Sequence, residues 1–476
     1  MSAVRRFSAR FSGIPRLTAS LAGLLVAAHA VAGDPLSTAR LHASAPAAGM
    51  VENCRVMPAG QALTLGEVIE QALCNNPQTH LAWANARAQA AQVGIARGAY
   101  LPTLSASVGR NRNVNEAANG TARTARNQTA AGLNFSLLLF DFGGREAALE
   151  SAMQLMAALA ASENAVLQSV FLAAVQAYYQ SLAAEAAVVA ARESERASLE
   201  SLKAAEARYR IGSGTPADSL QAQTAAAQAT LVRIQAEGNA RTALGVLANT
   251  LGLDAHRAPT LAAPAESGPE AGPEASFEGD IAELIAAAKR QRPDLTAAEA
   301  QLRAAEAGIQ TARASGLPSI SLAASGQYQD NSLPDATRGH TVGINVSIPL
   351  FSGFSTTYRV RAAEAQRDAR LAQRDQLDRQ VSLDVWRAYF SLQSGTEAVR
   401  ATTALLASAE QSARVATGRY RAGVGGILEL LNAQSALANA RQQHIQAYYN
   451  WRIARATLAQ AMGKIDFDWM QGQAKP

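Results

Sequence analysis

The sequence predicts a mainly α-helical fold with transmembrane β-strands. Three observations predict it: long alanine-rich stretches with helical periodicity, four shorter segments of alternating polarity, and a duplication of this whole pattern. Of the 476 residues only 5% are aromatic and 17% are charged, so a string of compact domains with bulky cores is not expected. Small side chains let helices pack closely, and the length is expected to go into long helices.

The N-terminus has the features of a secretory signal peptide, predicted over residues 1–32. Four arginines precede or border the apolar run LTASLAGLLVAAHAVA at 17–32, whose last three residues, AVA, fit a small-residue cleavage site. The alternative is an N-terminal membrane anchor, but about 20 apolar residues are needed to span a bilayer. We expect a mature chain that begins with an N-terminal extension over 33–60.

The net charge argues against a nucleic-acid partner. The whole chain carries a formal charge of +5, but four arginines and no acidic residue lie in the predicted signal peptide, which leaves 5 − 4 = +1. No basic run with interleaved aromatic residues occurs in the sequence. We therefore expect no nucleic acid among the partners.

The two cysteines, Cys54 and Cys74, both lie near the mature N-terminus. An oxidising periplasm permits a disulfide between them, and two unpaired thiols are the alternative. Neither cysteine follows an apolar run and a lipobox, so a lipid anchor is not expected. Two cysteines and scattered histidines do not form a metal site.

The mature chain contains an internal duplication. The windows RYRIGSGTPADSLQAQTA and RYRAGVGGILELLNAQSA begin 419 − 208 = 211 residues apart and are identical at nine of eighteen positions. Tyr178 and Tyr389 keep this offset (389 − 178 = 211), whereas Pro102 and Pro318 differ by 318 − 102 = 216. One loop between these markers therefore differs in length. The stretch 258–280 is rich in Pro, Gly, Ala and Glu and is expected to connect the two copies.

Each copy has the same order of predicted elements: a helix, a β-hairpin, a long helix, a Gly-rich break and a second helix. The first copy (61–257) has these elements at 65–100, about 101–143, 145–211 and 216–251. The second copy (281–463) has them at 281–316, about 319–351, 355–422 and 427–462, followed by a C-terminal tail at 464–476. Apolar residues at helical spacing predict helix-on-helix packing, namely Leu167, Phe171, Tyr178 and Leu182 in the first copy and Val381, Val385, Tyr389 and Leu392 in the second.

The hairpin segments alternate apolar with small or polar residues, as transmembrane barrel strands do. In TVGINVSIPLF, for example, Val342, Ile344 and Val346 alternate with Gly and Asn. One such hairpin would equally fit a half-buried soluble sheet, but two equivalent hairpins in an exported chain without a spanning helix favour a membrane barrel. Open strand edges are not tolerated in lipid and four strands cannot close a barrel, so several chains are needed. Three chains give twelve strands.

In these features the chain resembles the TolC-like outer-membrane channel-tunnels, the outer membrane efflux protein family. The resemblance covers nearly all of the mature chain: both repeats, LPTLSASVG and LPSISLAASG at the hairpin starts, LFDFGG and PLFSGF at their ends, and the paired RYRxGxG breaks. It implies a trimeric 12-stranded β-barrel in the lipid of the cell outer membrane, continuing into a long periplasmic α-helical barrel. It also implies that 258–280 belongs to a middle domain, and that the protein has no catalytic residues and no cofactors.

The same resemblance implies the partners. Family members are homotrimers that dock onto an inner-membrane transporter through a periplasmic adaptor, the membrane fusion protein. Overall likeness within the family favours type I secretion of a protein toxin such as cyclolysin, with a transporter of the ABC type. The alternative is the outer-membrane channel of a multidrug efflux pump, since no motif separates the two.

The Gly-rich breaks are expected to be helix turns at the periplasmic end of the tunnel. Glycine permits the left-handed turn that reverses a helix. Two breaks in each of three chains give six tips around one opening, where family members meet the adaptor and where the closed entrance constricts. Helix capping alone is the alternative explanation of the tip residues, which are Gly212, Gly214, Gly423, Val424, Gly425 and Gly426.

A carboxylate follows the first glycine of each break by six residues: Asp218 (212 + 6) and Glu429 (423 + 6). Converging carboxylates at a narrow entrance would favour cations. The alternative is that each acid only stabilises the first turn of its helix through the helix dipole. In the family pattern two entrance aspartates match Glu429 and Asn432, so one acidic ring is lost or moved.

The resemblance also bears on how the entrance closes. The tyrosine that helps to hold it shut in the family matches Tyr420, whereas the partner arginine matches Gly425, which has no side chain to make that bond. Arg419 or Arg421 could replace this arginine by reaching Asp218; otherwise the resting entrance is expected to be looser.

Two other classes of protein compete with a channel. An enzyme would need a nucleophile, an acid–base pair or a cofactor site, but the six histidines are scattered and no Gly-rich phosphate loop follows a strand. A periplasmic coiled-coil adaptor also has long helices with a tip hairpin. It would, however, keep an N-terminal membrane anchor and a compact β domain, and would not duplicate the whole plan.

Overall fold

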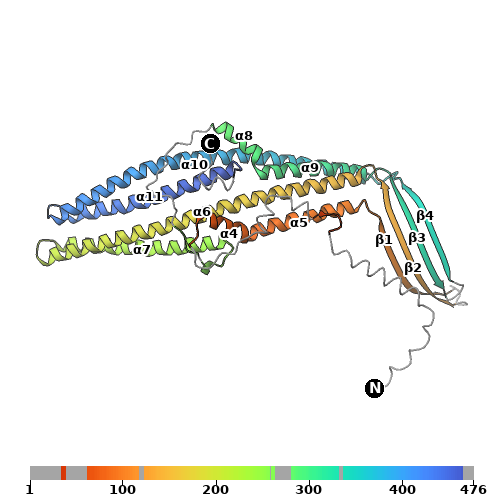
Figure 1. Cartoon of the computed structure of the whole chain (residues 1–476), viewed down its shortest axis with the longest axis horizontal. Coiled ribbons are helices and arrows are strands. Elements are labelled where there is room, and N and C mark those ends of the chain that lie inside the picture. The colour runs from red at the N-terminus through yellow and green to blue at the C-terminus, as the bar shows by residue number, and fades with distance from the viewer. Residues whose placement is uncertain are drawn as a thin grey trace, which may run out of the picture. The chain divides into compact units, whose positions relative to one another are not determined.

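The computed structural model describes residues 34–38, 62–116, 123–257, 259–262, 280–331 and 336–464 (Figure 1). The predicted signal peptide and nearly all of the N-terminal extension, the connector and the C-terminal tail lie outside the described residues. The chain divides into two compact units. One holds the strands, within Ala90–Phe140 and Ser319–Val346; the other holds the long helices, within Asp141–Pro318 and Ser347–Pro476 together with Ala45–Gln89.

The strand unit contains one antiparallel sheet in the order β1-β2-β3-β4. Its strands are β1 (Thr103–Glu116), β2 (Arg123–Phe140), β3 (Ser319–Asn331) and β4 (Thr337–Ser347). The hairpins of the two repeats are joined through β2 and β3, where Ala131 lies opposite Tyr328. The predicted alternation places aliphatic side chains on one strand face, and on β4 Val342 and Ile344 are 72% and 66% exposed.

The helical unit contains two helices of 67 residues, α6 (Gly144–Arg210) and α10 (Ser355–Arg421). Each would measure about 100 Å at the usual rise of an α-helix. After a short turn each is followed by a helix of 35 residues, α7 (Pro216–Thr250) or α11 (Ile427–Ala461). The shorter elements are α4 (Leu65–Asn75), α5 (Pro77–Gly98), η1 (Ala255–Arg257), α8 (Ile281–Gln291) and α9 (Pro293–Ala314).

The first helical stretch of each repeat differs from the sequence prediction, because a proline divides it into two helices. Asn76 and Arg292 separate α4 from α5 and α8 from α9, and both have an extended backbone, with ψ of 128° and 124°. The ring of the following proline disfavours a helical conformation at the preceding residue. Pro77 and Pro293 then begin the next helices, where an N–H is not needed.

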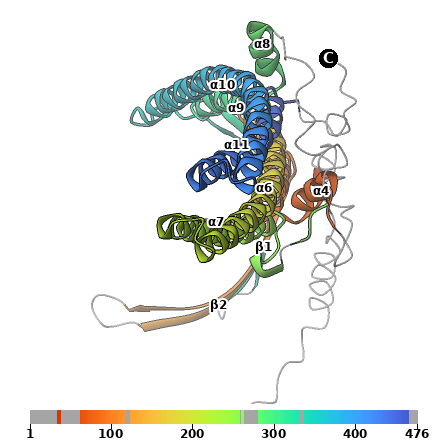
Figure 2. The ribbon, with the colours of Figure 1, turned by 90° about the vertical axis from the view of Figure 1, so that its left-hand side faces the viewer.

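Two helices of the second repeat, α9 and α11, pack between the long helices α6 and α10. Both α9 and α11 contact α6 and α10, so the two shorter helices lie one after the other along the long ones, while α7 packs on α6 (Figure 1, Figure 2). The residues predicted at helical spacing form this core: Phe171, Tyr178, Leu182, Val381, Val385 and Leu392 are buried, and Leu167 and Tyr389 pack against them. The predicted mainly α-helical class with four strands per chain is confirmed.

Among the described residues one helix, α6, is long and apolar enough to cross a membrane by length and composition. Sequence analysis expected no spanning helix. In the structure α6 contacts α4, α7, α9 and α11, and 39% of that apolar window is buried. A core helix passes the same test.

Cys74 lies at the end of α4, is buried and is disulfide-bonded. Its predicted partner, Cys54, lies outside the described residues, so the pairing stays a prediction.

Candidate entrance at the helix tips

Both Gly-rich breaks form the same helix-ending turn. In the first tip, Gly212 has φ +75° and its N–H donates to the Tyr209 carbonyl over 3.0 Å, while the Ser213 N–H donates to the Arg208 carbonyl over 3.0 Å. The second tip repeats this pattern: Gly423 has φ +83°, and the Val424 N–H donates to the Arg419 carbonyl over 3.1 Å. These are Schellman turns, whose positive φ favours glycine.

The second glycine of each break is needed because the backbone passes close to the helix that has just ended. A Cβ atom at Gly214 would lie 3.2 Å from Cβ of Arg208, and one at Gly425 would lie 3.0 Å from Cβ of Arg419. The capping explanation therefore accounts for these glycines. Contact with an adaptor stays a prediction. Val424, which lies between Gly423 and Gly425 in the second break, is 69% exposed and therefore accessible to a partner.

The two helices that leave the tips begin differently. Thr215 and Asp218 form a capping box: the Asp218 N–H donates to Thr215 Oγ1 over 3.2 Å, and the Thr215 N–H donates to Asp218 Oδ2 over 3.0 Å. In the second tip the capping position is Gly426, which has no side chain to cap α11. The equivalent acid, Glu429, instead pairs with Arg419, whose Nε lies 3.0 Å from Oε1.

Each predicted entrance carboxylate thus has a partner within its own turn. Asp218 is half-buried and caps α7, as the helix-start alternative predicted. The Glu429–Arg419 pair is about half exposed on both sides, and exposed pairs of this kind contribute about 0–1 kcal/mol. Arg419 therefore reaches Glu429 rather than Asp218, and Arg421 and Asn432 are exposed. Attraction of cations by Asp218 and Glu429 stays a prediction.

Tyr420 is the centre of contact between the two tips. Its ring is buried among Ala205 and Ala222 of the first repeat and Ile427 and Leu430 of the second. Burial raises the pKa of its hydroxyl, the positive charge of Arg208 opposes this rise in pKa, and the charge of Asp218 adds to it.

Arg208 reaches from α6 across to the second tip. Its guanidinium carbon lies 4.2 Å from the centre of the Tyr420 ring, a cation–π contact, and its Nη2 donates to the Tyr420 carbonyl. The structure therefore brings Arg208, Tyr420 and Asp218 together. Sequence analysis missed Arg208 although it opens the first RYR motif, because both copies carry the same motif and only packing decides which arginine meets which tyrosine.

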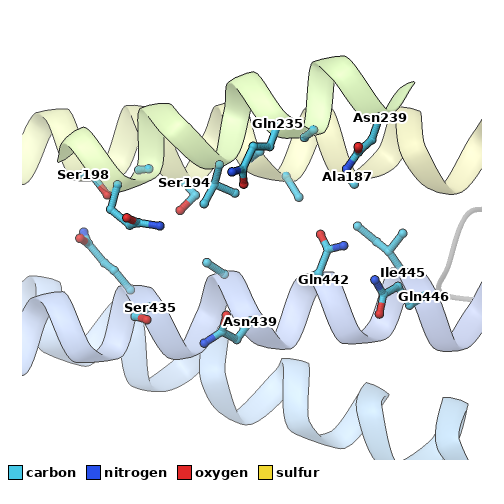
Figure 3. Close-up of a pocket in the computed structure, with 18 of the residues that line it drawn as sticks. Ala187, Ser194, Ser198, Gln235, Asn239, Ser435, Asn439, Gln442, Ile445 and Gln446 are labelled. Atoms are coloured by element: carbon cyan, nitrogen blue, oxygen red, sulfur yellow. The ribbon is translucent and has the colours of Figure 1, made fainter. Parts of the chain in front are cut away.

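Away from the tips, polar contacts continue along the junction between the repeats. Ser201 of α6 and Gln434 of α11 share a hydrogen bond of 3.0 Å, and Arg441 of α11 lies 2.8 Å from Glu193 of α6. Beside them is a cavity of about 630 Å³, lined mostly by small and amide side chains of α6, α7 and α11, with Val232, Leu431 and Ile445 among them (Figure 3). Gln235 of α7 and Gln442 of α11 point into it from opposite sides (Figure 3).

The part of the chain that the structure describes contains no group of three or more His, Cys, Asp or Glu side chains that could hold a metal ion. The polar chemistry of the tips consists instead of caps, one ion pair and the Arg208–Tyr420 contact. This arrangement can hold the helices of the two tips together.

Comparison with known proteins gives a family match to each of the two repeats. The model of the family described as "Outer membrane efflux protein" matches residues 68–253 and 284–464. Protein CyaE of Bordetella pertussis is 34% identical over 415 residues, which is 86% of this chain and 86% of that protein. The pyoverdine export outer membrane protein OpmQ of Pseudomonas aeruginosa is 28% identical, covering 84% of this chain and 85% of its own.

Solved structures show the same fold. The outer-membrane channel OprN superposes with a TM-score of 0.74 at 23% identity, over 87% of this chain and 95% of that chain. The CmeC outer membrane channel of Campylobacter jejuni superposes with a TM-score of 0.75 at 18% identity, over 89% and 94%. The predicted combination of long helices with barrel strands is therefore the fold of known outer-membrane channels.

Proposed function

The chain belongs to the outer membrane efflux protein family, and we propose that it is the outer-membrane exit duct of a tripartite export system. Its location is the outer membrane, and the proteins of its family and fold are channels rather than enzymes. The duct would pass cargo from an inner-membrane transporter and a periplasmic adaptor to the exterior. The match of both repeats to the family model carries this proposal.

The duct requires a homotrimer. One chain supplies four strands, and the order β1-β2-β3-β4 leaves β1 and β4 as the edges of its sheet. Unpaired edges are not tolerated in hydrocarbon, so the edges must pair with neighbouring chains. Three copies give a barrel of twelve strands in the outer-membrane lipid, with the helices forming the periplasmic barrel.

The helix tips are the proposed docking point for the periplasmic adaptor. Ile211 in the first tip is 79% exposed and Val424 in the second is 69% exposed. Exposed apolar side chains at the helix tips suit a protein partner better than water. The adaptor would connect these tips to the inner-membrane transporter, for which we propose the ABC type.

The proposed cargo is a protein toxin such as cyclolysin, exported by type I secretion. The 34% identity to CyaE over most of both chains supports this choice. A multidrug efflux channel is the second candidate, because relatives of 27% identity include the toluene efflux protein TtgC of Pseudomonas putida. The coiled-coil adaptor is not retained, since the relatives are outer-membrane channels.

A strain that lacks this chain tests the cargo. We expect one large secreted protein to disappear from the culture supernatant while susceptibility to small apolar compounds stays unchanged. Hypersensitivity with an unchanged supernatant would instead assign the channel to efflux. Complementation with Ile211→Asp and Val424→Asp should fail although the channel reaches the membrane, whereas Ile211→Val and Val424→Ile should restore export.

A further inference from the structure

The apolar face of the sheet changes to arginine toward the hairpin end of β1. Residues directly opposite each other in antiparallel strands share one face of the sheet. The apolar pairs on this face are Leu104 with Phe135, Ala106 with Leu133, and Val108 with Ala131. The next two pairs are Arg110 with Thr129 and Arg112 with Asn127. Two arginines therefore continue the face on which Val108 is 71% exposed.

Arg338 on β4 lies on this same face. Its guanidinium carbon is 5.6 Å from the centre of the Tyr328 ring of β3. Tyr328 lies opposite Ala131, which belongs to the apolar face of β2. Both edge strands of the sheet therefore carry arginine on the apolar face, at the end where the hairpins turn.

The three arginines Arg110, Arg112 and Arg338 are exposed and have no carboxylate to neutralise them. Among the described residues, no carboxylate oxygen lies within 4.0 Å of any of their nitrogen atoms. Asp330 of β3 shares their face, but it lies opposite Thr129 and is therefore two strands, about 10 Å, from Arg110. The face thus has a net positive charge at this end.

The arginines begin where the apolar band of a membrane barrel would end. From Ala131 to the end of β2 at Phe140 there are 140 − 131 = 9 residues, about 30 Å along the strand. At a strand tilt of about 40° this length covers about 23 Å of membrane height, close to the usual apolar band of about 25 Å. Arg110 is in the first pair beyond Ala131, which places it at the boundary between hydrocarbon and headgroups.

The opposite ends of the strands carry exposed aromatic residues instead. Phe140 ends β2, Phe142 follows it, and Phe351 and Phe354 follow β4 within seven residues of the chain. Membrane barrels usually have aromatic girdles at both boundaries. Here phenylalanine marks the boundary next to the helices, whereas arginine marks the boundary at the hairpin turns. The two boundaries are therefore suited to headgroups of different charge.

We propose that Arg110, Arg112 and Arg338 bind the phosphate groups of a phosphorylated glycolipid in the outer leaflet of the membrane. A guanidinium group donates two parallel N–H bonds to a phosphate, and its long aliphatic stem can lie along the apolar surface below. This inference rests on the outer-membrane barrel of the proposed function and goes beyond it, because it names a ligand class and its binding residues.

Closure of the barrel gathers these arginines at the seams between chains. Because β1 and β4 are the two edges of the sheet, the proposed trimer puts Arg338 of one chain on the strand beside Arg110 and Arg112 of the next. Three seams then give three sites, each with three positive charges. A glycolipid that carries two phosphate groups complements such a site in charge.

Native mass spectrometry of the full chain in detergent tests the proposal, with bisphosphorylated lipid A as the probe. The wild-type trimer should retain lipid A. Arg110→Gln, Arg112→Gln and Arg338→Gln should each lower its affinity about fivefold, and the triple variant should retain almost none. The matched control is Arg126→Gln. Arg126 lies opposite Asn113 near the same end of β2 but on the other face, so this variant should bind like wild type.

Two further probes separate a lipid site from a site for free phosphate. Lipid A without its phosphate groups should not be retained, and inorganic phosphate at equal concentration should not displace the intact lipid. The proposal fails if the dephosphorylated lipid binds equally well, if inorganic phosphate displaces lipid A, or if the single and triple variants bind like wild type. A trimer that retains no lipid A overturns this inference and leaves the proposed function intact, whereas a monomer overturns both.

Discussion

The two helix tips have nearly the same sequence and the same turn but different surroundings. In the first tip Thr215 and Asp218 cap the departing helix, and Tyr209 lies half exposed. In the second tip Gly426 provides no side-chain cap, and Tyr420 is buried beneath Arg208. Local chemistry therefore holds the first tip together, whereas packing against the other repeat holds the second. The tip without a side-chain cap is the one whose tyrosine is buried in the contact between the two tips.

The largest effect is expected from removing the buried tyrosine. Tyr420→Ala should lower the free energy of unfolding of the tip hairpins by about 3 kcal/mol, because it deletes an aromatic ring from a packed cluster. Tyr209→Ala removes a half-exposed ring and should cost less than half as much. Hydrogen exchange of the α6–α7 and α10–α11 turns measures both. Equal losses would mean that the two tips are supported equally.

Removing the arginine that crosses between the tips should have the next largest effect. Arg208→Ala loses the cation–π contact and the bond to the Tyr420 carbonyl, together about 2 kcal/mol. If this contact holds the entrance shut, channel openings in planar bilayers should become about 30-fold more frequent. Arg210→Ala is the matched control, because Arg210 lies on the same helix end and is exposed. An Arg208→Ala channel as quiet as wild type would contradict this role.

Removing the side-chain cap of the first tip and adding one to the second should change the stability of the two tips in opposite directions. Thr215→Ala should destabilise α7 by about 1 kcal/mol, because the Asp218 N–H loses its side-chain acceptor. Gly426→Ser should stabilise α11 by a few tenths of a kcal/mol, since its backbone is already extended and a Cβ atom there meets nothing within 4 Å. Chemical denaturation of the assembled protein reports both. Destabilisation by Gly426→Ser would show that this tip cannot accept a cap.

The smallest effect is expected on ion selectivity. Asp218→Asn with Glu429→Gln removes both charges and keeps side chains of the same size. Cation selectivity should fall modestly, because Arg419 already neutralises part of the charge at Glu429. Reversal potentials in a salt gradient measure the change. Arg419→Ala alone should raise cation selectivity if the acids face the passage, and unchanged potentials in both variants would show that they do not.

Much of the fold follows from local sequence patterns. Helix-forming stretches without proline run from Gly144 to Arg210 and from Ser355 to Arg421, within a residue of the predicted limits. Alternating polarity located all four strands, and the glycines located both turns. Pro77 and Pro293, which divide the first helical stretch of each repeat into two helices, were also visible in the sequence. Because helical periodicity continues on both sides of each proline, the prediction gave one continuous helix instead.

The sequence by itself determined the elements, the duplication and the family, because each depends on residues close together in the chain or on matching stretches. Only the tertiary structure decided which members of each duplicated pair are engaged. Arg208 and Arg419 open the same RYRxGxG motif, and Tyr209 and Tyr420 follow them in it, so the motif cannot distinguish them. The distinction arises because a chain with two copies has one internal junction, which buries Tyr420 and leaves Tyr209 exposed.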